Sequence, residues 1–230
     1  MLARIVKYVR TYGLAASAAH ISRRAYRSLV PPMRHVYCAY LTDIPLPAGS
    51  EDSPVRVRAF QSIHEIPSAV LEELLSRGTI DDKKPYSDAV VTSFLTWLFS
   101  QGAVFWTCYE DKKLVGYLWS IQGSREEPRY HFFPLGTRDA VFLAHEIFPA
   151  YRGRQLNRTM THLVLGEMKA SGIERVYVDV ELSNTRSLQS FSKTFFSPVG
   201  LARMKKLKKR QIVVWARKKQ PAVAGSIPKS

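Results

Sequence analysis

Three arginines and one glycine surround a predicted turn between a strand and a helix. Arg152, Gly153, Arg154 and Arg158 follow Pro149, which ends a run of mainly apolar residues. The first backbone N–H groups of a helix have no partner within the helix and point outward at the positive end of its dipole. This arrangement suits a phosphate, and each charge-assisted hydrogen bond contributes about 1.5–3 kcal/mol. The turn therefore predicts an anion site, with a solvated surface turn as the plainer alternative.

The elements around this turn predict a mixed α/β sheet with helices on both faces. Alternating and β-branched runs predict strands at residues 35–41, 55–60, 103–110, 113–121, 139–148, 175–181, 198–207 and 211–217. Helical spacing of apolar residues predicts helices at 63–77, 86–101, 154–171 and 184–195. Asp111-Lys112 indicates a hairpin between two of these strands, and Asn184 is suited to cap the last helix. Strands interleaved with helices in this order indicate an α/β class.

The turn is similar to the cofactor motif of the GNAT acetyltransferase superfamily. Residues 149–157 read PAYRGRQLN. The family motif is a Gln or Arg, two residues, a Gly, one residue, and a Gly or Ala, usually after Pro and Tyr. Residues 184–200 (NTRSLQSFSKTFFSPVG) resemble the family's Asn-x-x-Ser helix and final strand, and Val115-Gly116-Tyr117 resembles its hydrophobic–Gly–Tyr strand. The resemblance covers residues 55–217.

Four residues depart from the family pattern. Gln155 and Asn157 stand where the family has two glycines in the phosphate turn. Phe191 replaces the helix tyrosine that commonly donates a proton to the leaving thiolate, and Phe195 replaces the usual glycine before the last Phe. Side chains at 155 and 157 either crowd a pyrophosphate or bond to it, and no tyrosine on this helix supplies the acid.

The resemblance implies a mostly antiparallel mixed sheet flanked by helices on both faces, which binds acetyl-CoA or another acyl-CoA and uses no metal. The backbone near Glu146 and Ile147 would pair with the pantetheine arm, the turn would hold the pyrophosphate, and Asn184 would lie near the arm. The implied cofactor-binding residues are Ile147, Arg152, Gly153, Arg154, Gln155, Leu156, Asn157, Arg158 and Asn184.

Acyl transfer to an amine also requires a group that removes a proton. His145 is the first candidate, because an unperturbed histidine titrates near neutral pH. Strand alternation places Val141, Leu143, His145 and Ile147 on one face and Glu146 on the other. Glu146 is the second candidate and His131 the third, and a hydrogen-bonded structural histidine is the alternative for His145.

The net charge of +15 is concentrated at the two ends of the chain. Residues 1–42 contain seven Lys or Arg and no acid, and the chain after Glu181 contains 12 and no acid. Residues 2–29 combine an apolar stripe with these bases, which is typical of a docked helix or of one that contacts an anionic membrane surface. Nucleic acid is a less favoured partner, because no recognised nucleic-acid motif is present. No segment has the roughly 18 consecutive apolar residues of a membrane span.

The sequence therefore predicts an acyltransferase that moves an acetyl or other acyl group from acyl-CoA to a primary amine of a small molecule, with an amino sugar or envelope precursor as one example. The alternative is a catalytically weakened binding module of the same fold, whose basic ends bind nucleic acid or anionic membrane. We expect a basic N-terminal extension and linker at 1–54, the acyltransferase domain at 55–217, and a disordered basic tail at 218–230. Two cysteines match no metal spacing and favour a reducing, cytoplasmic setting. The oligomeric state stays open.

Overall fold

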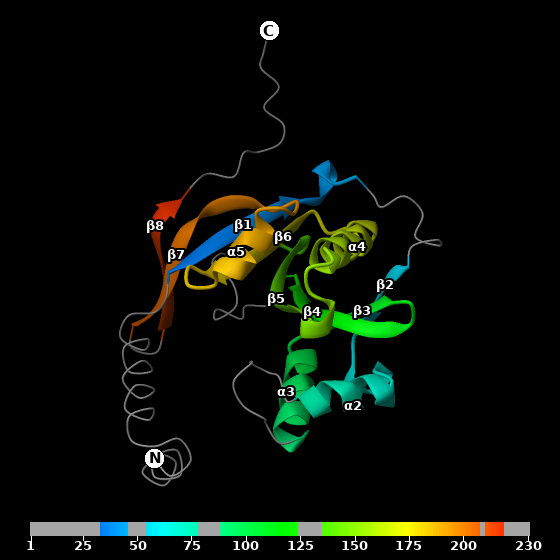
Figure 1. Cartoon of the computed structure of the whole chain (residues 1–230). Helices are drawn as coiled ribbons and strands as arrows, with labels where there is room; N and C mark the ends of the chain where they lie inside the picture. The colour runs from blue at the N-terminus through cyan, green and yellow to red at the C-terminus, as the bar shows by residue number, and fades with distance from the viewer. Residues whose placement is uncertain (1–32, 46–53, 78–87, 124–134, 208–209, 219–230) are drawn as a thin grey trace, which may run out of the picture.

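The structure is a computed structural model that describes residues 33–45, 54–77, 88–123, 135–207 and 210–218. Eight strands form one sheet in the order β2-β3-β4-β5-β6-β1-β7-β8 (Figure 1). All neighbouring pairs are antiparallel except β5 and β6. The predicted mixed, mostly antiparallel sheet is confirmed.

The strands lie close to their predicted positions. Their bounds are β1 (Arg34–Tyr40), β2 (Val55–Phe60), β3 (Ala103–Glu110), β4 (Lys113–Gln122), β5 (Asp139–Ile147), β6 (Arg175–Glu181), β7 (Ser197–Leu207) and β8 (Arg210–Lys218). The β3–β4 hairpin turns at Asp111 and Lys112, whose φ angles of 48° and 67° are both positive. Two positive φ angles are typical of the tight turn that matches the twist of a hairpin.

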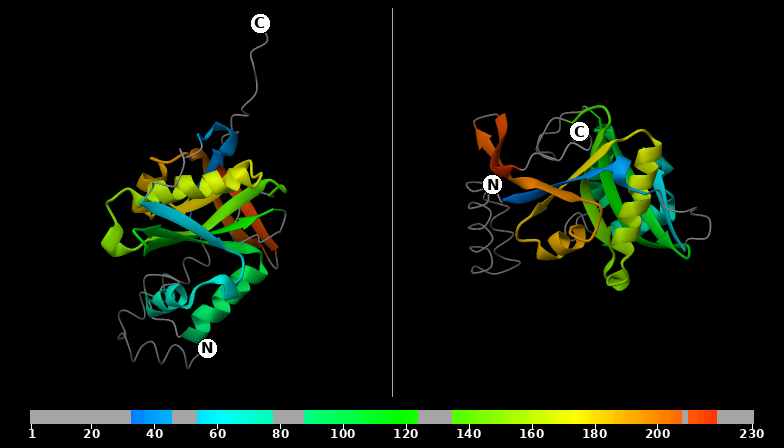
Figure 2. Two further views of the ribbon diagram at one scale, coloured as in Figure 1. Left: turned by 90° about the vertical axis from the view of Figure 1, so that its right-hand side faces the viewer. Right: turned by 90° about the horizontal axis from the view of Figure 1, so that it is seen from above.

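Helices cover both faces of the sheet, as the left view of Figure 2 shows. They are α2 (Ser68–Arg77), α3 (Asp88–Ser100), α4 (Leu156–Ala170) and α5 (Thr185–Phe191), with short 3-10 turns at Leu41–Asp43, Ile63–Glu65 and Pro149–Tyr151. Buried residues of α4 and α5 join one apolar core, and those of α2 and α3 join a second core on the opposite face. The face covered by α4 and α5 is called the α4 face below, and the other is called the α3 face.

Strand β1 lies within the sheet, although the predicted domain begins at residue 55. It pairs with β6 from Arg34↔Glu181 to Tyr40↔Arg175, and with β7 on its other side. Val36 and Cys38 are buried on the α3 face, while Tyr37 and Ala39 are buried on the α4 face. A strand buried on both faces is integral to the sheet, so these residues belong with it structurally. The basic segment at residues 2–29 and the tail after Lys218 lie outside the described residues.

Gly116 allows β4 and β5 to approach each other closely. It pairs with Ile147, and a Cβ atom at this position would lie 2.4 Å from the backbone oxygen of Glu146. Any side chain would therefore push the two strands apart. This contact fixes the position of the end of β5, where the candidate site begins.

Candidate active site

A β-bulge interrupts strand β5 before the predicted catalytic residues. Its pairing with β4 shifts register between Trp119↔Ala144 and Ser120↔Phe142, which leaves Leu143 without a partner in the ladder. An extra residue in one strand reverses the faces of the residues that follow it.

The prediction that Val141, Leu143, His145 and Ile147 share one face of the strand is therefore wrong. Val141 and Leu143 pack on the α3 face, whereas Ile147 packs on the α4 face. The ring of His145 lies 5.8 Å from the ring of Phe191, a residue of the α4-face core. The bulge thus separates His145 from the first half of its own strand.

Strands β5 and β6 stop pairing at the same point. Their parallel ladder runs only from Asp139↔Arg175 to Phe142↔Val178. Beyond Phe142, the residues of β5 from Ala144 to Ile147 pair with β4 alone. The backbone edge of β5 that faces β6 is consequently not paired with β6 at the candidate catalytic residues His145 and Glu146.

His145 occupies an apolar environment. Its side chain is partly buried, and its Nε2 atom is shielded from solvent and has no hydrogen-bond partner. Burial lowers the pKa of His145 to about 4, because the charged imidazolium loses its hydration. The expected titration near neutral pH is thus corrected, and the imidazole is neutral at pH 7.

Glu146 lies within a small polar group that connects β4, β5 and the turn. Its Oε2 accepts a hydrogen bond of 3.1 Å from the Tyr117 hydroxyl, and its Oε1 lies 3.4 Å from Arg152 Nη2. Arg152 Nε also donates to the backbone oxygen of Ile147 at 2.9 Å. Arg152 therefore links the predicted anion turn directly to the end of β5.

The turn before α4 has two residues with positive φ angles, Gly153 at 84° and Gln155 at 59°. Gln155 is the N-cap of α4, and its side chain makes no capping hydrogen bond. Leu156 is buried, whereas Gly153, Arg154, Gln155 and Arg158 are exposed. The first N–H groups of α4 thus lie at a solvent-exposed turn, where an anion has access.

Two other predicted residues contact neighbouring elements. Arg154 Nη2 donates to Glu110 Oε1 on β3 at 2.7 Å. The amide of Asn157 donates to the hydroxyl of Ser190, which links the first turn of α4 to α5. Asn157 therefore has a structural partner at a position where the family has a glycine.

Asn184 caps helix α5, as the sequence predicts. Its Oδ1 accepts a hydrogen bond of 3.1 Å from the backbone N–H of Ser187. Asn184 is exposed, so its other side-chain atoms are accessible. Phe191, at the end of the same helix, is 5% exposed and contacts the rings of Tyr37 and Phe196. Phe191, which stands where the family has its tyrosine, is thus part of the apolar core.

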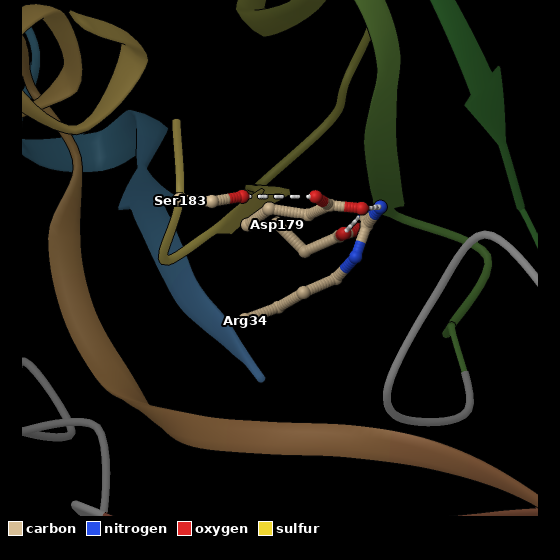
Figure 3. A network of polar contacts seen from close by, with 4 residues as sticks. Arg34, Asp179 and Ser183 are labelled. Atoms are coloured by element: carbon tan, nitrogen blue, oxygen red, sulfur yellow. Dashed lines mark hydrogen bonds and ion pairs between the residues drawn. The ribbon is translucent and has the colours of Figure 1, made fainter. Parts of the chain in front are cut away.

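Sequence reasoning missed an ionic network between β1 and β6. Arg34 binds Asp179 and lies 3.3 Å from Glu181 Oε1, and Ser183 donates to Glu181 at 3.2 Å (Figure 3). Burial raises the pKa of Asp179, and the charge of Arg34 opposes that shift. Asp179 directly follows the last residue of β6 that pairs with β5. No local signal could reveal this network, because Arg34 and Asp179 are 145 residues apart.

Several other groups are less suited to chemistry. Cys38 and Cys108 are buried, and burial raises the pKa of each thiol to about 12. Within the described ranges, no group of three or more His, Cys, Asp or Glu is placed to hold a metal ion. None of the helices described here is both long and apolar enough to cross a bilayer. His131 lies outside the described residues.

Comparison with known proteins identifies the family. Residues 68–195, more than half of the chain, match the Acetyltransferase (GNAT) family. The chain belongs to the GNAT acetyltransferase family. No curated protein sequence matches it.

Solved structures of GNAT proteins are similar to this chain. The glucosamine N-acetyltransferase region of a fungal multi-domain β-N-acetylglucosaminidase has a TM-score of 0.51 at 13% identity, over 87% of this chain and 22% of that chain. A GNAT-family protein from Novosphingobium aromaticivorans DSM 12444 has a TM-score of 0.46 at 19% identity, over 74% and 61%. A GCN5-related N-acetyltransferase from Sphaerobacter thermophilus has 0.49 at 16%, over 80% and 53%. The GNAT chain thus spans less than two thirds of each of these proteins.

Proposed function

We propose that this GNAT protein transfers an acetyl or other short acyl group from acyl-CoA to a primary amine of a small molecule. The observation that carries the proposal is the turn Arg152–Asn157. It offers the exposed N-terminus of α4 and two exposed arginines, of which Arg152 contacts the end of β5, and β5 has an edge there that β6 does not pair. An anionic group at this turn and an extended arm along β5 match the two halves of CoA.

Each part of the cofactor has a candidate partner. The N-terminus of α4, with Arg152, Arg154 and Arg158, would hold the pyrophosphate. The pantetheine arm adds to β5 through the backbone near Ile147, in the manner of an extra strand. Arg152 would then have a phosphate oxygen as a further charge-assisted partner beside Glu146.

We assign proton removal to Glu146 in preference to His145. The amine nitrogen attacks the thioester carbonyl carbon, a C–N bond forms, the C–S bond breaks, and CoA leaves as a thiolate. Glu146 takes the proton from the amine, directly or through water, and its carboxylate attracts the ammonium form beforehand. His145 is neutral but weakly basic, because its pKa is lowered to about 4. A thiol has an ordinary pKa of about 8.5, so the thiolate can leave without an acid on α5.

Binding of acetyl-CoA tests this function. Calorimetry of the full chain should give saturable binding, and replacing both Arg152 and Arg154 with Ala should weaken it more than tenfold, since two charge-assisted contacts are lost. Arg138→Ala is the matched control, because Arg138 is also an exposed arginine in an ion pair, with Glu174 at 2.6 Å. Equal affinity in the double variant and the control would contradict the assigned turn. Absence of any acetyl-CoA binding would favour the binding-module alternative.

Turnover assays test whether the protein acylates a small primary amine. A panel of small primary amines with acetyl-CoA should release free CoA thiol, detected with a thiol reagent, and the N-acetyl product should appear by mass spectrometry in equal amount. Amino sugars belong in the panel, and alcohols of matched shape test O-transfer. Thiol release without an acylated product would indicate hydrolysis of the donor rather than transfer.

A further inference from the structure

An apolar cavity of about 100 Å³ lies on the α3 face, away from the proposed cofactor turn. Four residues of α3 and one of α2 form one wall, and residues of β3, β4 and β5 form the other. The walls include Val91, Leu98, Phe105, Tyr117, Leu143 and Ala144. No charged side chain contributes to the described wall.

The β-bulge of β5 shapes this cavity. Leu143, which has no partner in the ladder, and the next residue, Ala144, both contribute to the wall. The same irregularity turns His145 to the opposite face. The bulge thus places an apolar wall on the α3 face immediately before Glu146.

Tyr117 connects the cavity to the polar group at Glu146. Its side chain forms part of the wall, and its hydroxyl donates to Glu146 Oε2 at 3.1 Å. The ring also lies 5.9 Å from the ring of Phe105, a second wall residue. The cavity therefore has an apolar interior, and one of its wall residues is hydrogen-bonded to the Glu146 carboxylate.

We propose that this cavity binds the apolar part of the acceptor, so that the acceptor is a primary amine carrying an alkyl chain of about four carbons or a comparably small ring. This inference rests on the proposed function. An apolar cavity of about 150 Å³ accepts benzene, so one of about 100 Å³ suits a somewhat smaller group. The apolar chain occupies the cavity, while the ammonium lies next to the Glu146 carboxylate.

The position of the cavity favours the acceptor over a longer acyl chain of the donor. The proposed phosphate turn opens helix α4 on one face of the sheet, and the cavity lies under α3 on the other. Donor and acceptor then approach the end of β5 from opposite faces. The negative charge of Glu146 also matches an amine rather than an acyl group.

A series of n-alkylamines tests the inference. With acetyl-CoA as donor, kcat/KM should rise about fourfold per methylene from methylamine to butylamine, which corresponds to about 0.8 kcal/mol for each buried methylene. The rise should end near butylamine, once the cavity is filled. Butylamine should also raise Tm more than methylamine at equal concentration, without any need for turnover.

Two neighbouring valines provide a matched pair of variants. Val91 is 5% exposed and forms part of the cavity wall, whereas Val90 is 47% exposed. Val91→Phe should remove the preference for butylamine, so that kcat/KM no longer rises from methylamine to butylamine. Val90→Phe should keep the full chain-length preference. If Val91→Phe does not fold, Leu98→Ala should extend the preferred chain by one or two carbons instead.

The donor series separates the remaining outcomes. With methylamine as acceptor, acyl-CoAs from acetyl to hexanoyl should show no such rise. A rise with acyl length that Val91→Phe removes would overturn the inference and place the acyl chain in the cavity. A flat alkylamine series with intact acetyl-CoA turnover would overturn it while leaving the proposed function in place. Absence of acetyl-CoA binding would instead contradict the proposed function.

Discussion

The Tyr117 hydroxyl donates a hydrogen bond of 3.1 Å to Glu146 Oε2 across the antiparallel strands β4 and β5. The other oxygen of the same carboxylate lies 3.4 Å from Arg152 at the turn before α4. Glu146 thus connects the proposed cofactor turn to the wall of the acceptor cavity.

Glu146→Gln should lower kcat about 10²–10⁴-fold, because the amide keeps the shape of the side chain but cannot accept the proton of the amine. The Kd of acetyl-CoA should change by less than about threefold. Steady-state kinetics and calorimetry measure the two quantities, with Glu167→Gln on the exposed surface of α4 as the control. Wild-type kcat in Glu146→Gln would exclude this carboxylate as the base and return the role to His145 or to water.

His145 should make the protein less stable as the pH falls. Its pKa is about 4 in the folded state and about 6.5 in the unfolded state. Between these values only the unfolded chain binds the proton, so the free energy of unfolding falls from pH 7 to pH 4.5 by about 2 kcal/mol from this residue. His145→Leu should remove that part of the pH dependence, as measured by urea unfolding at both pH values.

His64 provides the control for this measurement, because it is an exposed histidine on the turn before α2. His64→Leu should keep the full loss of stability between pH 7 and pH 4.5. The assignment to His145 fails if the two variants behave alike.

Gln155→Gly should stabilise the protein, whereas Gly153→Ala should destabilise it. Both residues have a positive φ angle, 59° and 84°, which a glycine adopts without strain. The left-handed conformation of a non-glycine residue costs about 1 kcal/mol or more, and part of the gain is offset by the greater freedom of glycine in the unfolded chain. We expect changes of about 0.5–1 kcal/mol of opposite sign in thermal unfolding. Changes of the same sign would show that backbone strain is not the cause.

Arg34→Ala should destabilise the protein by about 2 kcal/mol at pH 7. It leaves Asp179, whose side chain is 10% exposed, without its cation and next to Glu181. Solvent screening limits the loss, because Arg34 is itself 35% exposed. The folded-state pKa of Asp179 is already raised by burial and should rise further, so stability should fall as pH rises through that range. Relative to the wild type, Arg34→Ala should therefore lose less free energy of unfolding at pH 4 than at pH 7.

Arg138→Ala is the comparison for Arg34→Ala. Arg138 and Glu174 form an ion pair of 2.6 Å with side chains that are 66% and 44% exposed. Such an exposed pair contributes less than about 1 kcal/mol. Urea unfolding of both variants at pH 4 and pH 7 measures the difference, and equal losses would mean that the network of Arg34 is not energetically distinct from a surface pair.

The sequence by itself determined the elements and the turn. Alternation and helical spacing act within about ten residues, so they located strands such as Arg175–Glu181 and the helix that begins near Leu156. The Asp111-Lys112 hairpin and the Asn184 cap are also local, because each depends on residues no more than three positions apart. The order of these elements and the turn motif were enough to indicate the GNAT fold.

Only the tertiary structure decided what these elements bring together. The unpaired Leu143 depends on the register between β4 and β5, and it reverses the face of His145 that strict alternation assigns. The place of β1 between β6 and β7 depends on pairing over more than 140 residues, and it creates the contact of Arg34 with Asp179. The lowered pKa of His145 results from burial by residues distant in the chain. Register, strand order and desolvation are non-local properties, so no short segment of the sequence contains them.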